Sequence, residues 1–316
     1  MAAVVSTAAS ASTTAAVERA LRGRRADWRG IVFQGALLAT LVTALVILTV
    51  LIGNVIRTGM PVFRERGADF LTSDLSSFAF RAGVWQGILG SVCLMLFVVV
   101  LAFPLGIGAA VYIEEYARDT RLTRFINANI RNLAGVPSIV YGLLGLAIFV
   151  KALGAITGPD AQGRSLISAG LTLAIMVLPI IIITSAEALR AVPQSIREAG
   201  YGVGATRWEV VRSHVLPYAA PGILTGTVLS LARAIGETAP LILVGATTGY
   251  LGSNATFLES FSQRFTALPI IIFRWASLPD QAFRALTAAA IMVLLAVLLL
   301  MNSVAIVLRN RYDRKW

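Results

Sequence analysis

The stretch EALRAVPQSIREAGYGVGATRWEVVRSHVLP, residues 187–217, is a polar loop between two long apolar segments. Two hydroxyl residues in it are each followed three positions later by a glutamate, Ser195 by Glu198 and Thr206 by Glu209. At this spacing the hydroxyl and the carboxylate can satisfy the free N–H groups at the start of a helix reciprocally. Three glycines separate the two candidate starts, at positions 200, 202 and 204. The loop therefore predicts a helix, a glycine-rich turn and a second helix.

The segments on either side of this loop belong to a set of six that are long and apolar enough to cross a membrane, which takes about 20 residues. They lie at roughly 30–56, 84–113, 132–153, 166–186, 215–247 and 284–308. Residues of the AVILMFWYC set make up 57% of the chain and charged residues only 14%, a composition far too apolar for a soluble domain. The sequence predicts an all-α polytopic membrane protein with six transmembrane helices.

The distribution of lysine and arginine predicts the orientation of these spans. The net charge is +11, but basic excess in a membrane protein usually sets topology and does not indicate nucleic-acid binding. With the N-terminus inside, 17 Lys and Arg residues fall on the inner segments and 9 on the outer loops. We therefore expect both termini and the loop 187–217 in the cytoplasm. Residues 1–28 are expected to form a disordered cytoplasmic tail, and residues 29–316 the transmembrane domain.

The fifth span contains two charged residues, Arg233 and Glu237, within LSLARAIGETAPLILVG, residues 229–245. An isolated charge near the bilayer centre costs at least about 2.5–3.5 kcal/mol. Four positions apart on a helix, the two side chains share a face and can pair. Pro240 cannot donate a hydrogen bond to the carbonyl of Gly236, so the helix should be weakened beside Glu237.

Small and polar residues continue the same face toward the start of the span, at Ser230, Gly226 and Gly222. Such faces let helices approach closely in lipid, so this one is expected to point inward. A planar guanidinium offers two parallel donors to an oxyanion such as phosphate, with Glu237 as its counter-ion when the site is empty. The alternative is an ion pair that serves helix packing alone.

The loop 187–217 resembles the EAA loop of ABC-importer permeases. Glu198, Ala199 and Gly200 are followed by three residues and Gly204, then by nine residues and His214, which precedes Val215-Leu216-Pro217. The pattern departs at Gly200, where a second Ala is usual, and at His214, where Ile is usual. The resemblance implies a type I-like permease fold whose cytoplasmic coupling helix docks on a separate ATPase, with Glu198, Ala199, Gly200 and Gly204 at the coupling site. The alternative is an amphipathic surface helix without a partner.

Three further motifs together resemble the permease subunits of the phosphate ABC importer, in the PstA-type form: GVPSIVYGLLGLAIFV (135–150), ARAIGETAPLILVG (232–245) and LPIIIFRWASLPDQAF (268–283). The resemblance implies a binding-protein-dependent inner-membrane component of a bacterial cytoplasmic membrane. Its implied partners are a homologous PstC-type permease, two PstB-type ATPase subunits and an extracytoplasmic PstS-type phosphate-binding protein. Arg233 and Glu237 then belong to the phosphate pathway.

ATP chemistry is expected outside this chain. A P-loop needs G-x-x-x-x-G-K-[ST], and the only lysines, Lys151 and Lys315, lack that context. ATP and Mg²⁺ would therefore be bound by the partner ATPase, and we expect no catalytic residue, cofactor or metal site here; Cys93 is the only cysteine.

Two other functions remain open from the sequence. One is an ABC permease for another anion or small solute. The other is a proton-coupled secondary carrier in which Glu237 titrates, although such a carrier has no use for an ATPase-docking loop.

Overall fold

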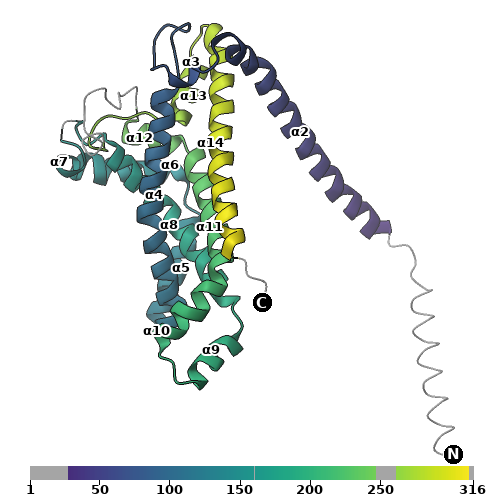
Figure 1. Cartoon of the computed structure of the whole chain (residues 1–316), viewed down its shortest axis with the longest axis vertical. Helices are drawn as coiled ribbons and strands as arrows, with labels where there is room; N and C mark the ends of the chain where they lie inside the picture. The colour runs from purple at the N-terminus through teal and green to yellow at the C-terminus, as the bar shows by residue number, and fades with distance from the viewer. Residues whose placement is uncertain (1–27, 160, 247–260, 313–316) are drawn as a thin grey trace, which may run out of the picture. The chain divides into compact units, whose positions relative to one another are not determined.

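The computed structural model of the chain describes residues 28–159, 161–246 and 261–312, and all regular secondary structure in these ranges is helical (Figure 1). The chain divides into two compact units, Met1–Asn54 and Val55–Trp316. The predicted tail lies outside the described residues except for Trp28, and residues 247–260 lie outside them as well.

The first unit contributes the beginning of helix α2 (Trp28–Arg66). Its side chains from Trp28 to Asn54 are exposed in the isolated chain, although most of them are apolar. Such a surface is suited to lipid or to another membrane protein, and not to water.

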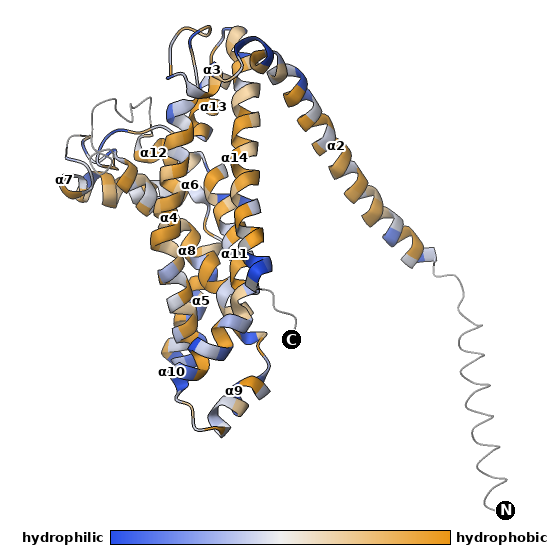
Figure 2. Cartoon of the chain, viewed as in Figure 1, coloured by the Kyte–Doolittle hydropathy of each residue, from blue (hydrophilic) through white to orange (hydrophobic). Residues whose placement is uncertain are grey.

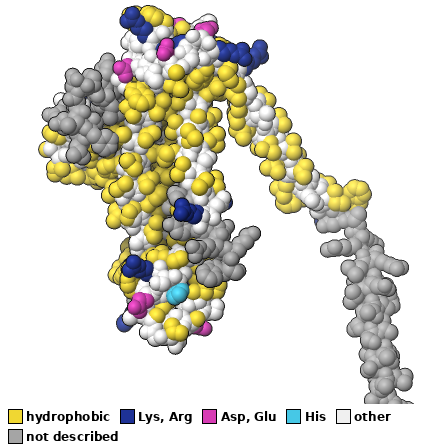
Figure 3. Space-filling model, in the orientation of Figure 1, with side chains coloured by type: hydrophobic (Ala, Val, Ile, Leu, Met, Phe, Trp, Pro, Cys, Tyr) yellow, Lys and Arg dark blue, Asp and Glu magenta, His cyan; other side chains and the backbone are white. Residues whose placement is uncertain are grey.

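The second unit is built on four long helices: α4 (Trp85–Val111), α8 (Leu166–Arg190), α11 (Leu216–Gly236) and α14 (Ala282–Tyr312). Helix α8 packs against both α4 and α11, and α11 packs against α14, so that α8 and α11 form the middle of the bundle (Figure 1). The helices are apolar along most of their length (Figure 2), and charged side chains gather toward the upper end and in the lower part of the face shown in Figure 3. This pattern is typical of a membrane-spanning bundle.

Close contact between α8 and α11 depends on the small residues predicted to face inward. A Cβ atom on Gly226 would lie 2.2 Å from Thr184 Oγ1, and one on Gly222 would lie 2.8 Å from the Ala188 Cβ. The Ser230 hydroxyl is buried and donates to the Gly226 carbonyl at 2.8 Å. The inward orientation is therefore confirmed for Gly226 and Ser230, which are buried, whereas Gly222 is exposed in the isolated chain.

The number of spans agrees with the sequence only if a bent helix pair is accepted as one of them. Five helices in the described residues are long and apolar enough to cross a membrane. The candidate for the sixth is the pair made of α5 (Arg121–Ala134) and of α6 (Ser138–Gly145) with the π-helical turn η2 (Leu146–Ala152), which is bent by 101° at the break. The prediction of one helix over 132–153 was wrong. Pro137 lacks an N–H group and disfavours helical geometry at Val136, and α6 begins directly after it.

The segment Leu268–Ala276 forms helix α13, which is too short to span a membrane and packs on α4 and α14. Its first N–H group, on Leu268, donates to the buried Ser91 hydroxyl at 2.9 Å. Trp275 is buried at the other end of the helix, in a cluster with Phe283 of α14. Helix α13 therefore covers the end of the bundle opposite to the loop 187–217 (Figure 1).

Candidate functional site

The predicted ion pair forms at a break in the fifth span. Helix α11 ends at Gly236, Glu237 is extended with φ −83° and ψ 112°, and helix α12 (Ala239–Val244) begins with Pro240 in its first turn. The predicted weakening at Pro240 is confirmed. The expectation of one continuous helix face was wrong, because Glu237 lies just beyond the end of α11.

Arg233 and Glu237 nevertheless meet, with Arg233 Nε 3.4 Å from Glu237 Oε1. Their side chains are 39% and 22% exposed in the isolated chain. The pair is thus on a surface of this subunit and not sealed in its core. A guanidinium in this position keeps donors available for a second, external anion.

The break in the third span lies next to the break in the fifth. Helix α6 packs directly on α12, and a Cβ atom on Gly142 would lie 2.7 Å from the Pro240 Cα. Tyr141 of α6 donates its hydroxyl to the Leu133 carbonyl at 2.8 Å and is close enough to Arg233 for an electrostatic interaction. In secondary transporters, substrate sites are commonly formed where discontinuous helices meet.

Tyr141 was missed by sequence reasoning. The only available signal was the proline in GVPSIVYG, which marks a helix end but does not say which side chain of the helix comes near Arg233. Tyr141 joins the candidate site because two helix breaks far apart in sequence come together.

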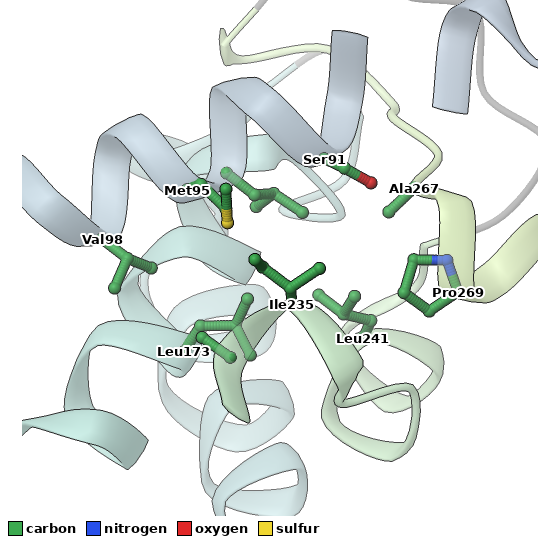
Figure 4. Close-up of a pocket in the computed structure, with 10 residues that line it drawn as sticks. Ser91, Met95, Val98, Leu173, Ile235, Leu241, Ala267 and Pro269 are labelled. Carbon is green, nitrogen blue, oxygen red and sulfur yellow. The ribbon is translucent and has the colours of Figure 1, made fainter. Parts of the chain in front are cut away.

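An apolar cavity lies behind the break in the fifth span (Figure 4). It is lined by Ser91, Leu94, Met95, Val98, Leu173, Ala234, Ile235, Leu241, Ala267 and Pro269. These side chains offer one hydroxyl and no cation, and an unpaired anion in such surroundings would be strongly disfavoured. The cavity is therefore not a site for an oxyanion, and the face that carries Arg233 is the better candidate.

The loop 187–217 folds as two helices with a turn between them. Helix α9 spans Gln194–Gly202, and α10 (Arg207–Val210) continues through a π-helical turn, η3 (Val211–Val215), into α11. The capping box at Thr206 is confirmed, with the Thr206 N–H donating to Glu209 Oε2 at 2.7 Å and the Glu209 N–H donating to Thr206 Oγ1 at 3.4 Å.

The second predicted capping box, at Ser195 and Glu198, was wrong. Helix α9 begins at Gln194 directly after Pro193, whose φ is −56°, and it has no side-chain cap. The proline ring fixes φ near the helical value, so the helix starts one residue before the serine. Ser195 consequently lies inside the first turn.

The four predicted coupling residues lie in two different settings. Glu198, Ala199 and Gly204 are exposed, while Gly200 is buried against α10, where a Cβ atom would come within 2.7 Å of Val210 Cγ2. Gly204 has φ +82°, a left-handed conformation that favours glycine. Val203 and Trp208 are exposed beside them, which the sequence did not single out. The loop thus presents the aromatic side chain of Trp208 outward, and aromatic residues are enriched at interfaces between proteins.

Comparison with known proteins adds to this geometry. Residues 102–315 match the sequence model of the family described as binding-protein-dependent transport system inner membrane component. The chain is 33% identical over 230 residues to the phosphate transport system permease protein PstA 1 of Mycobacterium tuberculosis strain CDC 1551 (73% of this chain, 71% of that protein). It is 34% identical over 226 residues to the phosphate transport system permease protein PstA of Yersinia pestis (71% of each).

Solved structures agree on the fold. A bacterial ABC transporter that imports alginate superposes with a TM-score of 0.62 at 16% identity, over 91% of this chain and 99% of the matched chain. The MetNI methionine ABC transporter superposes with a TM-score of 0.55 at 20% identity, over 73% of this chain and 95% of that one.

Proposed function

The chain belongs to the family of binding-protein-dependent transport system inner membrane components, and on that premise we propose that it is the permease subunit through which an ATP-driven importer moves inorganic phosphate. It is not itself an enzyme. Relatives named as phosphate permeases match over about 70% of both chains, which supports phosphate as the substrate.

The observation that carries the proposal is the position of Arg233. It lies beside a break in a membrane span, on a surface of this subunit, with one carboxylate and one phenol near it. A guanidinium can bind a phosphate oxyanion through two parallel hydrogen bonds. Glu237 then balances the charge when no phosphate is present, which lowers the cost of keeping a cation at this depth.

The partners follow from the two ends of the bundle. The exposed loop 187–217 is proposed to dock on a pair of PstB-type ATPase subunits, which bind ATP and Mg²⁺. A PstC-type permease would complete the pathway beside Arg233, and a PstS-type binding protein would deliver phosphate from the other side of the membrane. The family match does not favour the alternative hypothesis of a proton-coupled carrier, because the loop 187–217 would have no role in such a carrier.

Uptake by the reconstituted complex tests the substrate. The proteoliposomes contain this chain and the three proposed partners, with the ATPase facing the lumen and the binding protein outside. They should accumulate labelled phosphate only when ATP is enclosed in the lumen. Excess unlabelled phosphate should compete, whereas sulfate and molybdate should not. Competition by sulfate or molybdate as strong as that by phosphate would assign the permease to another anion.

Cysteine labelling in whole cells tests the orientation of the spans. In a Cys93→Ala background, a membrane-impermeant maleimide should label Phe78→Cys from outside and should label Val203→Cys only after the cells are opened. Both side chains are exposed in this chain, so accessibility is not limited by burial. Labelling of Val203→Cys in intact cells would contradict a cytoplasmic position of the loop 187–217.

A further inference from the structure

A buried ion pair connects helix α9 to the end of the second span. The second span continues from α4 into a π-helical turn, η1 (Tyr112–Tyr116), which carries Glu115. Arg197 of α9 donates to this carboxylate, with Arg197 Nη2 2.7 Å from Glu115 Oε1 and Nε 3.2 Å from the same oxygen. The two side chains are only 13% and 5% exposed. Ionised groups are kept in such a place only with close partners.

Arg197 also bonds to the end of the fourth span. Its Nη2 donates to the Leu189 carbonyl at 2.9 Å and its Nη1 donates to the Val192 carbonyl at 2.8 Å. Leu189 belongs to α8, and Val192 follows it just before α9. One guanidinium therefore joins three elements: α9, the end of α8, and η1 at the end of the α4 span.

The second helix of the loop reaches the same turn. The Arg207 guanidinium of α10 lies over the Tyr116 ring, 5.2 Å from its centroid, which is within cation–π distance. Both helices of the loop 187–217 thus contact η1 through an arginine. Single π-helical turns within α-helices frequently occur at functional positions.

A neighbouring pair shows what is specific about Arg197. Glu114, the residue before Glu115, accepts a hydrogen bond from Arg190 Nε at 2.8 Å. This pair links the same turn to α8 but does not reach α9, and Arg190 is 49% exposed. The two glutamates are adjacent in sequence and each holds an arginine, but only Glu115 is bonded to the loop's first helix.

We propose that the Glu115–Arg197 pair is the joint that transmits movement of the loop 187–217 to the α4 and α8 spans. The proposal rests on the proposed function, in which this loop docks on an ATPase. Glu198 and Ala199 stand exposed on the same helix, directly after Arg197, so the outer side of α9 is free for the partner while Arg197 holds its inner side. Arg197 and Glu115 are positioning residues: they act on the spans and do not touch phosphate or ATP.

The test compares matched variants of the complete complex in proteoliposomes, with phosphate moved per ATP hydrolysed as the measured quantity. Glu115→Gln and Arg197→Gln should lower this ratio by about tenfold or more, the size of a typical coupling between sites, while ATP hydrolysis and ATPase binding persist. Glu114→Gln and Arg190→Gln should leave the ratio close to that of the unmodified complex. An unchanged ratio in Glu115→Gln would overturn the proposal.

A second measurement needs no variant, in case a substitution prevents assembly. Amide hydrogen exchange is compared between nucleotide-free and ATP-bound states of the unmodified complex. Exchange should change together in Gln194–Gly202 and in Tyr112–Tyr116. A change confined to Gln194–Gly202 would overturn the joint. If the unmodified complex did not move phosphate, the proposed substrate would be wrong. The hydrogen-exchange result would then still test the role of the Glu115–Arg197 pair.

Discussion

Replacing Arg233 by glutamine is expected to lower phosphate uptake by about 10- to 100-fold, because a hydrogen bond to a charged group contributes about 1.5–3 kcal/mol. The variant keeps a polar side chain at the end of α11 and removes only the positive charge and the bidentate hydrogen-bond donor. The complex should still assemble and bind ATP, since Arg233 lies near the end of α11 and not in the loop 187–217. Uptake of labelled phosphate measures transport, and the amount of ATPase that co-purifies measures assembly.

The companion variants separate a substrate contact from a structural ion pair. If Arg233 serves only to neutralise Glu237, then the double variant Arg233→Gln with Glu237→Gln should restore transport, because it removes both charges and leaves neither without a partner. If Arg233 binds the moving anion, the double variant should remain as inactive as Arg233→Gln, and Glu237→Gln alone should be milder. We expect the second pattern.

An arginine outside the candidate site provides the control. Arg284 is exposed at the start of α14, and Arg284→Gln removes the same charge from the chain. Its phosphate uptake should stay near that of the unmodified complex.

Strong phosphate transport by the double variant Arg233→Gln with Glu237→Gln would instead show that the two residues only form an ion pair that stabilises the broken span.

Gly204→Glu is expected to abolish ATP-driven uptake while the chain still inserts into the membrane. Gly204 has φ +82°, and a residue with a Cβ atom in the left-handed region costs about 1–2 kcal/mol. The turn between α9 and α10 would therefore change its path, and a carboxylate would be added to the surface proposed to meet the ATPase. Loss should appear in phosphate uptake and in the amount of ATPase that co-purifies.

Gly202 provides a matched comparison two residues earlier. A Cβ atom at either glycine would meet nothing within 4 Å, but Gly202 lies at the end of α9 without a positive φ. Gly202→Ala should have little effect, Gly204→Ala a moderate one, and Gly204→Glu the largest. Normal uptake by Gly204→Glu would show that the turn does not take part in coupling.

The sequence by itself determined the class of protein, the two-helix form of the loop 187–217 and the pairing of the charged residues in the fifth span. These conclusions depend on local properties. Length and hydropathy identify spans because an isolated helix in lipid satisfies its own backbone hydrogen bonds. The Thr206 capping box and the weakness beside Pro240 involve residues at most four positions apart, so both were predictable and both are confirmed.

Local rules competed at two places, and there the sequence misled. Ser195 with Glu198 has the spacing of a capping box, but Pro193 starts the helix earlier. The span at 132–153 is continuous in hydropathy, but Pro137 divides it. In each case a proline, which fixes φ and cannot donate a hydrogen bond, overrode a weaker pattern.

The tertiary structure alone decided which distant residues meet. Glu115 and Arg197 are 82 positions apart, and nothing in either segment predicts that the carboxylate accepts hydrogen bonds from that arginine and not from its neighbours. The approach of Tyr141 to Arg233 likewise requires α6 to pack on α12, which depends on a glycine against the backbone of Pro240. Such contacts result from the packing of whole helices, and because each helix has several small-residue faces of similar quality, only the assembled bundle selects the faces that are used.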